Sequence, residues 1–231
     1  MSQKLLEFED IVCGYADTMV VRGVSGQVAQ GKVLGIVGRN GVGKSTLMKG
    51  LAGFLPIAGG RVRIRGRDLG TLASYARPQA GIVHAPQENM VFGELRVEEN
   101  LWLHLPDRNA QRYAAALSAF PRLTERLQQR AGLLSGGERK LLSFTRTLGL
   151  QASVSLLDEP TEGVQPENID RMASLVKNAN EAGRSFVIVE QNLTFIEQVA
   201  DEVMVLDHGK VVLSVPMAGL GRESIERHLV V

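Results

Sequence analysis

Long apolar runs are missing from this sequence of 231 residues. No window approaches the roughly 18–20 consecutive apolar residues that a membrane-spanning helix requires. The one cysteine, Cys13, excludes an internal disulfide framework and fits a reducing compartment. With 26 Lys and Arg against 25 Asp and Glu, there is no basic field to attract nucleic acid, and no such partner is expected. Because the segment MSQKLLEFED has no apolar secretory core, we expect a cytoplasmic protein.

Histidine is also scarce, and its positions do not indicate a metal centre. None of the four shows metal-ligand spacing, and we interpret them, with Cys13, as structural or surface residues: His84, His104, His208 and His228. The sequence contains no internal repeat, low-complexity tract or interdomain linker, which favours a single domain over 1–231. Residues 220–231 have the pattern of a short amphipathic helix.

The pattern of apolar residues predicts an α/β protein. Alternating apolar and polar residues predict antiparallel strands at 5–11, 20–28 and 60–67. Helix-forming residues dominate 97–105 and 109–129, with breaks at Pro106 and Pro121. A strand–helix alternation with parallel crossovers is then expected at 154–157, 169–180, 185–189 and 193–200. Two last apolar runs, 203–206 and 211–215, flank a hairpin turn at 207–210.

The most informative segment, residues 38–46, reads GRNGVGKST and matches the pattern G-x-x-x-x-G-K-[ST]. A predicted strand at 33–37 precedes it, and a predicted helix at 47–51 follows. Glycines let successive backbone N–H groups point at phosphate oxygens, and the helix adds the positive end of its dipole. Lys44 would reach the β and γ phosphates, and the Ser45 hydroxyl would bind Mg²⁺. The predicted nucleotide-binding residues of this loop are Gly38, Arg39, Asn40, Gly41, Val42, Gly43, Lys44, Ser45 and Thr46.

Two adjacent carboxylates, Asp158 and Glu159, follow the predicted strand at 154–157. Ligands meet parallel sheets at this end of a strand. Asp158 is placed to hold Mg²⁺, and Glu159 is placed to orient and deprotonate an attacking water. An exposed Asp-Glu turn is the alternative.

A second glycine-permitted helix start lies between these motifs, at residues 134–138, which read LSGGE. The residues alone allow either a plain helix cap or a second anion-binding helix start. With this segment the chain resembles the ATP-binding subunits of ABC transporters, whose signature motif is commonly LSGGQ. The resemblance covers nearly the whole chain and implies a P-loop NTPase core with a mixed sheet, an N-terminal antiparallel β subdomain and a helical subdomain at about 91–150. It also implies ATP and Mg²⁺ as cofactors.

The resemblance assigns further roles, residue by residue. Tyr15 would stack on adenine, and Gln87 would sense Mg²⁺ and the γ-phosphate. Ser135, Gly136, Gly137 and Glu138 would act on the ATP of a partner, with Glu138 in place of the usual glutamine. The implied catalytic residues are Glu159, Lys44 and Gln191, and the implied metal-binding residues are Ser45, Gln87 and Asp158.

Two departures from the family pattern indicate one branch of the family. Gln191 stands where the family often has a histidine, and a glutamine cannot carry a proton. The turn at 162–166 reads EGVQP and omits an aspartate that is usually tied to the dimer interface. Both features resemble the ATPases of importers for branched-chain amino acids, amides and urea.

We therefore expect an ATP-hydrolysing subunit that powers uptake of branched-chain amino acids or related small amides through a membrane importer. The alternatives are a urea importer, a lipid or polysaccharide exporter, and a non-transport ABC ATPase. Expected partners are a second ATPase subunit, identical or a sister chain, the transmembrane permeases and, indirectly, a periplasmic solute-binding protein. The expected location is the cytoplasmic face of the plasma membrane. Candidate permease contacts are Val91, Phe92, Leu95 and Trp102, although core packing is the better interpretation of Trp102 and a loop anchor that of Phe92.

Overall fold

The computed structural model describes residues 4–88, 90–103 and 105–218. The predicted helix at 220–231 lies outside the described residues, as do His104 and His228. Within the described part of the chain, no helix is both long enough and apolar enough to cross a membrane.

The N-terminal part forms a four-stranded antiparallel sheet in the order β2-β1-β4-β5. Its strands are β1 (Lys4–Tyr15), β2 (Thr18–Ala29), β4 (Ile57–Ile64) and β5 (Arg67–Asp68). The strand predicted at 60–67 is wrong in its bounds, because Arg65 (φ 49°) and Gly66 (φ 77°) form a left-handed turn. The chain therefore folds back after Ile64 and starts β5.

The central sheet has six strands in the order β10-β9-β3-β8-β7-β6. Five strands run parallel and β10 pairs antiparallel with β9, so the predicted mixed sheet is confirmed. Its strands are β3 (Val33–Val37), β6 (Ile82–Ala85), β7 (Val154–Asp158), β8 (Ser185–Val189), β9 (Glu202–Asp207) and β10 (Lys210–Pro216). The sequence analysis missed β6, which has four residues and no alternation clear enough to distinguish it from a loop.

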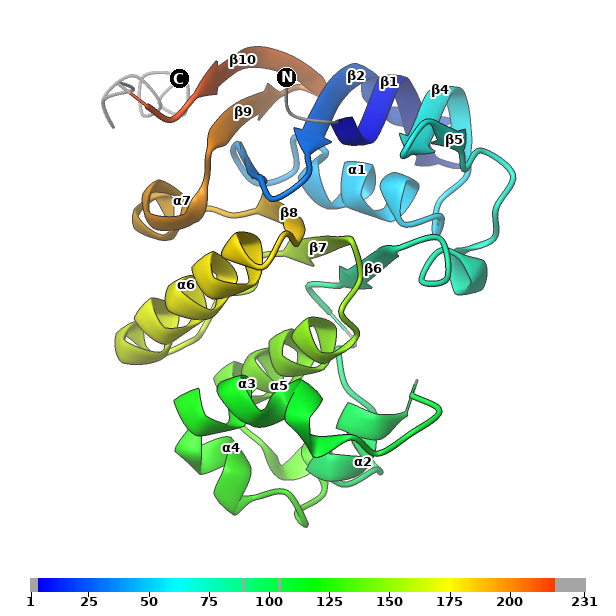
Figure 1. Ribbon diagram of the computed structural model, residues 1–231. Helices are drawn as coiled ribbons and strands as arrows, with labels where there is room; N and C mark the ends of the chain where they lie inside the picture. The colour runs from blue at the N-terminus through cyan, green and yellow to red at the C-terminus, as the bar shows by residue number, and fades with distance from the viewer. Residues whose placement is uncertain (1–3, 89, 104, 219–231) are drawn as a thin grey trace.

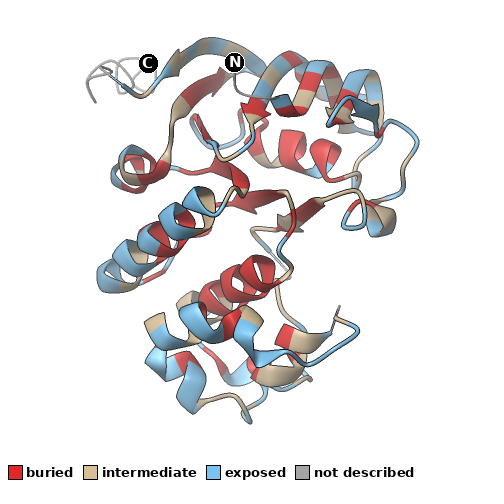
Figure 2. Cartoon of the chain, in the orientation of Figure 1, coloured by how far each residue is buried: buried red, intermediate tan, exposed pale blue. Residues whose placement is uncertain are grey.

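The central sheet separates two cores, and β3 contributes to both. Val33 and Val37 face one core, whereas Leu34 and Ile36 face the other. The second core holds α1 (Lys44–Leu51) and the antiparallel sheet, which Figure 1 shows on the same side of β7 and β8. The first core holds α5 (Gly136–Gly149), α6 (Pro166–Glu181) and α7 (Leu193–Val199). Figure 2 shows α5 mainly buried and α6 with exposed residues along its outer face.

A group of short helices lies below α5 and α6 in Figure 1, away from the antiparallel sheet. It contains α2 (Val97–Trp102), α3 (Ala114–Ala119) and α4 (Pro121–Glu125). The chain also forms 3₁₀ turns at Ser74–Ala76, Ala110–Tyr113 and Ala131–Leu133. Pro121 begins α4, as the predicted break required. Trp102 packs edge-on against Tyr113 at 5.0 Å, which confirms its core role.

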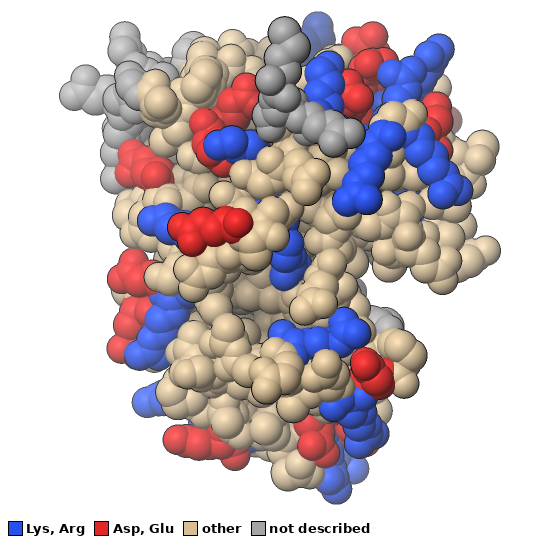
Figure 3. Space-filling view, in the orientation of Figure 1, with Lys and Arg blue, Asp and Glu red and all other residues tan. Residues whose placement is uncertain are grey.

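Charge is distributed without a field of one sign on the face shown in Figure 3, where basic and acidic side chains are interspersed. On β1 and β4 this mixing is a cross-strand pattern, because Glu7 pairs with Arg63 and Glu9 with Arg61. Arg63 also forms an ion pair with Glu9 at 3.2 Å. These charges cover the open face of the sheet with alternating signs.

Candidate active site

The phosphate loop connects β3 to α1 and leaves the start of this helix without a side-chain cap. Gly43 is the N-cap residue, with φ 108°, and as a glycine it has no side chain that could accept a hydrogen bond. Gly41 also has a positive φ of 81°, which a side chain would strain. A Cβ atom on Gly38 would lie 2.4 Å from the Leu206 carbonyl oxygen, so only glycine fits there. The first turn of α1 contains no acidic residue, and its N–H groups suit an anion.

Lys44 curls back over this loop. Its ammonium donates to the carbonyl oxygens of Gly38 at 2.7 Å and Arg39 at 2.8 Å, and the residue is 4% exposed. Burial lowers the pKa of Lys44, while the nearby carboxylates of Glu159 and Asp158 oppose that shift. The Lys44 ammonium and the backbone N–H groups of this loop together provide the positive charge that a phosphate group requires.

Asp158 ends β7 directly opposite the start of α1. Its Oδ1 accepts a hydrogen bond from the Ser45 hydroxyl at 3.0 Å, and the residue is 2% exposed. Burial raises the pKa of Asp158 to about 6, the Ser45 hydrogen bond opposes this shift, and the neighbouring Glu159 adds to it. The hydroxyl and carboxylate oxygens that the sequence assigned to one metal site are thus brought together.

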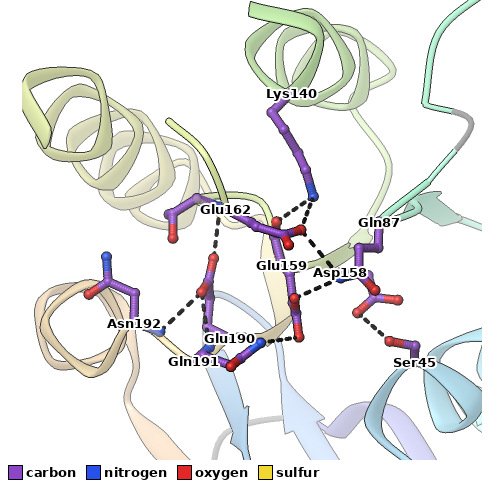
Figure 4. Close-up of polar contacts among 10 residues, drawn as sticks. Ser45, Gln87, Lys140, Asp158, Glu159, Glu162, Glu190, Gln191 and Asn192 are labelled. Carbon is purple, nitrogen blue, oxygen red and sulfur yellow. Dashed lines mark hydrogen bonds and ion pairs between the residues drawn. The ribbon is translucent and has the colours of Figure 1, made fainter. Parts of the chain in front are cut away.

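Glu159 is held by two glutamine amides (Figure 4). Its Oε2 accepts from Gln87 Nε2 at 2.8 Å, and its Oε1 accepts from Gln191 Nε2 at 2.9 Å. Its backbone is left-handed, with φ 47°, which is unusual for a residue with a side chain. The structure therefore gathers Gln87, Glu159 and Gln191, three residues from loops after β6, β7 and β8.

Glu190 is a buried carboxylate that the sequence analysis did not single out. It is 2% exposed and accepts hydrogen bonds from the backbone N–H groups of Thr161 at 2.8 Å, Gln191 at 3.0 Å and Asn192 at 3.2 Å. Burial raises its pKa, and these hydrogen bonds oppose the shift. Glu190 thereby fixes the loops that carry Glu159 and Gln191. The sequence contained a signal for this residue: Glu190 lies directly after the end of β8, and Asp158 is the last residue of the neighbouring strand β7.

Lys140 connects the second glycine-rich helix start to this group. It lies on α5, is 6% exposed and donates to the backbone oxygen of Glu159 at 2.8 Å. It also forms an ion pair with Glu162 at 3.3 Å, and Glu162 accepts from Gln87 at the same distance. The sequence analysis assigned no role to Lys140 or Glu162.

The start of α5 is capped by its own side chains. Ser135 Oγ accepts from the Glu138 N–H at 3.3 Å, and Glu138 Oε2 accepts from the Ser135 N–H at 2.9 Å. Arg126 pairs with Glu138 at 2.9 Å. Burial raises the pKa of Glu138, but the Ser135 hydrogen bonds and the Arg126 and Arg122 charges lower it more, and the net shift is downward.

The two helix starts line separate cavities. One cavity, of about 290 Å³, is lined by Asn40, Gly41, Gly43, Lys44, Ser45, Thr46, Gln87, Glu159, Glu162 and Gln191. The other, of about 760 Å³, opens between α4, α5 and α6 and includes Ser135, Gly136, Gly137 and Glu138 in its lining. Tyr15 lines neither; it is 47% exposed at the end of β1, where its hydroxyl meets Lys49 Nζ at 3.3 Å. Its contact with adenine stays a prediction.

Comparison with known proteins agrees with this geometry. A family model described as ABC transporter matches residues 21–162. The chain belongs to the ABC transporter family. It is 34% identical to the high-affinity branched-chain amino acid transport ATP-binding protein BraG of Pseudomonas aeruginosa, over 90% of this chain and 91% of that protein. It is 33% identical to the probable branched-chain amino acid transport ATP-binding protein LivF of Archaeoglobus fulgidus, over 86% of each.

Solved structures give the same family. A nucleotide-free ATP-binding cassette from an ABC transporter superposes with a TM-score of 0.79 at 27% identity, covering 97% of this chain and 94% of that one. A cassette in its ADP conformation gives a TM-score of 0.78 with the same identity and coverage. The fold is thus that of the ABC ATPases, and the chain is an ATPase subunit of this family.

Proposed function

We propose that this chain powers the uptake of branched-chain amino acids or related small amides by hydrolysing ATP on a membrane importer. The observation that carries the proposal is the similarity along nearly the full length to two proteins named for branched-chain amino acid transport. Relatives named for export or resistance, a Nod factor export protein and a linearmycin resistance protein, are less similar, at 28% identity over 70% and 68% of their lengths.

Hydrolysis would take place in the cavity beside the phosphate loop. Lys44 and the N–H groups at the start of α1 would bind the phosphates and stabilise the negative charge that spreads over the γ-phosphate oxygens during in-line attack. Glu159 would accept the proton of the attacking water, with its carboxylate oriented by Gln87 and Gln191. Since Gln191 is neutral, the proton has no histidine to pass to at this position.

Ser45 and Asp158 fit Mg²⁺. The hydroxyl and carboxylate oxygens lie 3.0 Å apart, and oxygen ligands are those that this hard cation prefers. One protein carboxylate suffices, because Mg²⁺ at such sites keeps several waters and takes its other ligands from the substrate phosphates. When bound, the ion would neutralise charge on those phosphates. Gln87 would complete the site from the β6 side.

A second ATPase subunit would complete the ATP site. Ser135 to Glu138 line a cavity separate from that of the phosphate loop, so these groups would act on ATP held by a partner. Head-to-tail docking of two cassettes explains why one small chain has two glycine-rich helix starts. The partner is a second copy or a sister chain.

The permease would contact the loop before α2, on the part of the chain at about 91–150 that we propose as the helical subdomain. Phe92 is 52% exposed there, and two hydrogen bonds from the buried Asn100 side chain hold its backbone. Asn100 Oδ1 accepts from the Phe92 N–H at 2.8 Å, and Asn100 Nδ2 donates to the Phe92 oxygen at 3.0 Å. A rigidly held exposed aromatic suits a protein contact. The chain would thus sit on the cytoplasmic face of the plasma membrane.

Uptake by living cells tests the proposal. Cells from which the gene is deleted should lose uptake of labelled leucine, and the wild-type gene should restore it while the Glu159→Gln gene does not. Uptake of a sugar serves as the control for general energisation and should not change. Loss of urea uptake with normal leucine uptake would replace the proposed substrate by urea, and normal uptake of leucine, small amides and urea would refute an importer role in this branch.

A further inference from the structure

Lys140 is a buried cation whose ammonium contacts two residues of the candidate active site. It is 6% exposed and reaches from α5 to the Glu159 backbone oxygen at 2.8 Å and to the Glu162 carboxylate at 3.3 Å (Figure 4). A buried ammonium needs such partners, because an unpaired one carries a large desolvation cost. The side chain of its ion-pair partner Glu162 is 57% exposed, so this ion pair contributes little to the free energy of unfolding. Stability alone therefore gives little reason for a lysine here.

The Glu159 backbone is the element that Lys140 holds. Its left-handed φ of 47° costs on the order of 1–3 kcal/mol for a residue with a side chain, and such a conformation persists only where its surroundings fix it. Three hydrogen bonds to its backbone hold it in this structure: the Glu159 N–H donates to the Val189 oxygen at 2.9 Å, and the Glu159 oxygen accepts from Lys140 at 2.8 Å and from the Glu162 N–H at 3.4 Å. Lys140 thus supplies the shorter of the two hydrogen bonds to the backbone oxygen of this strained residue.

Glu162 extends the contact to the other side of the active site. Its Oε2 accepts from both Lys140 and Gln87 at 3.3 Å, and Gln87 in turn donates to Glu159 at 2.8 Å. Glu162 also lines both cavities, that of the phosphate loop and that of the α5 start. A continuous polar path therefore runs from α5 to the carboxylate that would activate water.

We propose that Lys140 is a positioning residue that sets Glu159 for attack and transmits engagement of the α5 start to hydrolysis of the ATP held by the same chain. The inference rests on the proposed function, since in the dimer Ser135 contacts the partner's ATP while Lys140, on the same helix, holds its own chain's Glu159. Lys140 would then link the two ATP sites of a dimer and make their hydrolysis cooperative.

Steady-state ATPase kinetics of the full-length protein test the proposal. Lys140→Met should lower kcat by about 10- to 100-fold, the scale of loss that follows a small misplacement of a reacting group. The KM for ATP should change by less than about two-fold, because the phosphate loop is untouched. The Hill coefficient for ATP should fall toward one. Lys140→Arg, which keeps a charged donor, should recover most of the kcat.

Lys177→Met on the exposed face of α6 is the matched control and should leave kcat, KM and the Hill coefficient unchanged. Thermal unfolding should show that Lys140→Met still folds cooperatively, with a lower melting temperature because the Glu159 oxygen loses its shortest hydrogen bond. Should Lys140→Met fail to fold, Glu162→Gln provides the second test, because this side chain is 57% exposed and tolerates replacement. It should lower kcat at constant KM.

Either variant with wild-type kcat and Hill coefficient would overturn the inference, as would a loss confined to KM. These outcomes leave the proposed function intact, because the wild-type protein still hydrolyses ATP in them. An absence of hydrolysis by the wild-type protein would overturn the proposed function itself, and with it the inference.

Discussion

The two glycine-rich helix starts of this chain differ in whether side chains form hydrogen bonds with the backbone N–H groups there. At α1 the N-cap is Gly43, no side chain caps the helix, and the first turn holds no acidic residue. At α5 Ser135 and Glu138 form a reciprocal capping box, and Glu138 places a carboxylate in the first turn. The α1 start is therefore open to an anion, whereas part of the α5 start is already occupied by its own chain.

This difference supports our proposal that the two helix starts bind different ATP molecules. The α1 start has its own cation, Lys44, and a carboxylate and hydroxyl pair beside it, so one chain supplies the groups at this start that would bind phosphate. The α5 start lines another cavity, and Lys140 on the same helix contacts the Glu159 oxygen. A glycine-rich helix start is thus not enough to define a nucleotide site; the side chains around it decide.

The largest expected effect concerns hydrolysis at the α1 side. Glu159→Gln should lower kcat by about 10²- to 10⁴-fold, because the variant keeps the hydrogen-bonding shape but loses the base. ATP binding should persist, and ATP should trap a dimer detectable by sizing chromatography. Adding Ser135→Arg should abolish that dimer if the two starts meet across it. Glu181→Gln, at the exposed end of α6, is the control. Unchanged turnover in Glu159→Gln would remove Glu159 from its assigned role.

The affinity of the isolated chain for ATP should depend on the α1 start and not on the α5 start. Lys44→Ala should weaken ATP binding by about 100-fold, the effect of about 3 kcal/mol expected for a hydrogen-bonded charge. Ser135→Ala should leave the affinity within about two-fold, because the α5 start lines a different cavity. Titration calorimetry at concentrations where the chain is monomeric measures both. Equal losses in the two variants would contradict the assignment of separate cavities.

The contrast also shows what the sequence could and could not predict. The loop at 38–46 and the Asp158–Glu159 pair were predictable, because spacing and position at strand ends define their chemistry. Contacts between distant segments were not: Lys140 reaches Glu159 and Asn100 fixes Phe92 only through tertiary packing. Strand boundaries failed where a left-handed turn interrupts a regular alternation, as at Arg65.

Close packing at the α5 start predicts a difference between its two glycines. A Cβ atom on Gly137 would lie 2.5 Å from the Gly163 oxygen, a backbone atom, whereas one on Gly136 would meet nothing within 4 Å. Gly137→Ala should therefore lower the free energy of unfolding by about 1–3 kcal/mol. Gly136→Ala should be neutral or raise it by up to about 1 kcal/mol through the unfolded state. Urea unfolding compares the two. A Gly137→Ala protein as stable as Gly136→Ala would refute the close approach.

The smallest expected effect is on the stability of the protein at acid pH, and it concerns Glu138, a carboxylate in the first turn of α5. Glu138 has a lowered pKa in the folded protein, although burial raises it, because the Ser135 hydrogen bonds and the Arg126 and Arg122 charges outweigh burial. The ionised form therefore stabilises the folded protein above the unfolded-state pKa, and this contribution is lost as the pH falls through the folded-state pKa. Glu138→Gln keeps both capping acceptors but does not titrate. Its free energy of unfolding should thus fall less than that of the wild type between neutral pH and about pH 4, by under about 1 kcal/mol.

The measurement is urea unfolding over that pH range, with Glu181→Gln, an exposed carboxylate on α6, as the control that should follow the wild type. The α1 start offers no counterpart, because its first turn contains no acidic residue. An identical pH dependence for the wild type and Glu138→Gln would mean that the charge of Glu138 does not support the cap. In that case the two helix starts would differ only in their hydrogen bonds, and Glu138 would serve the helix as an uncharged glutamine would.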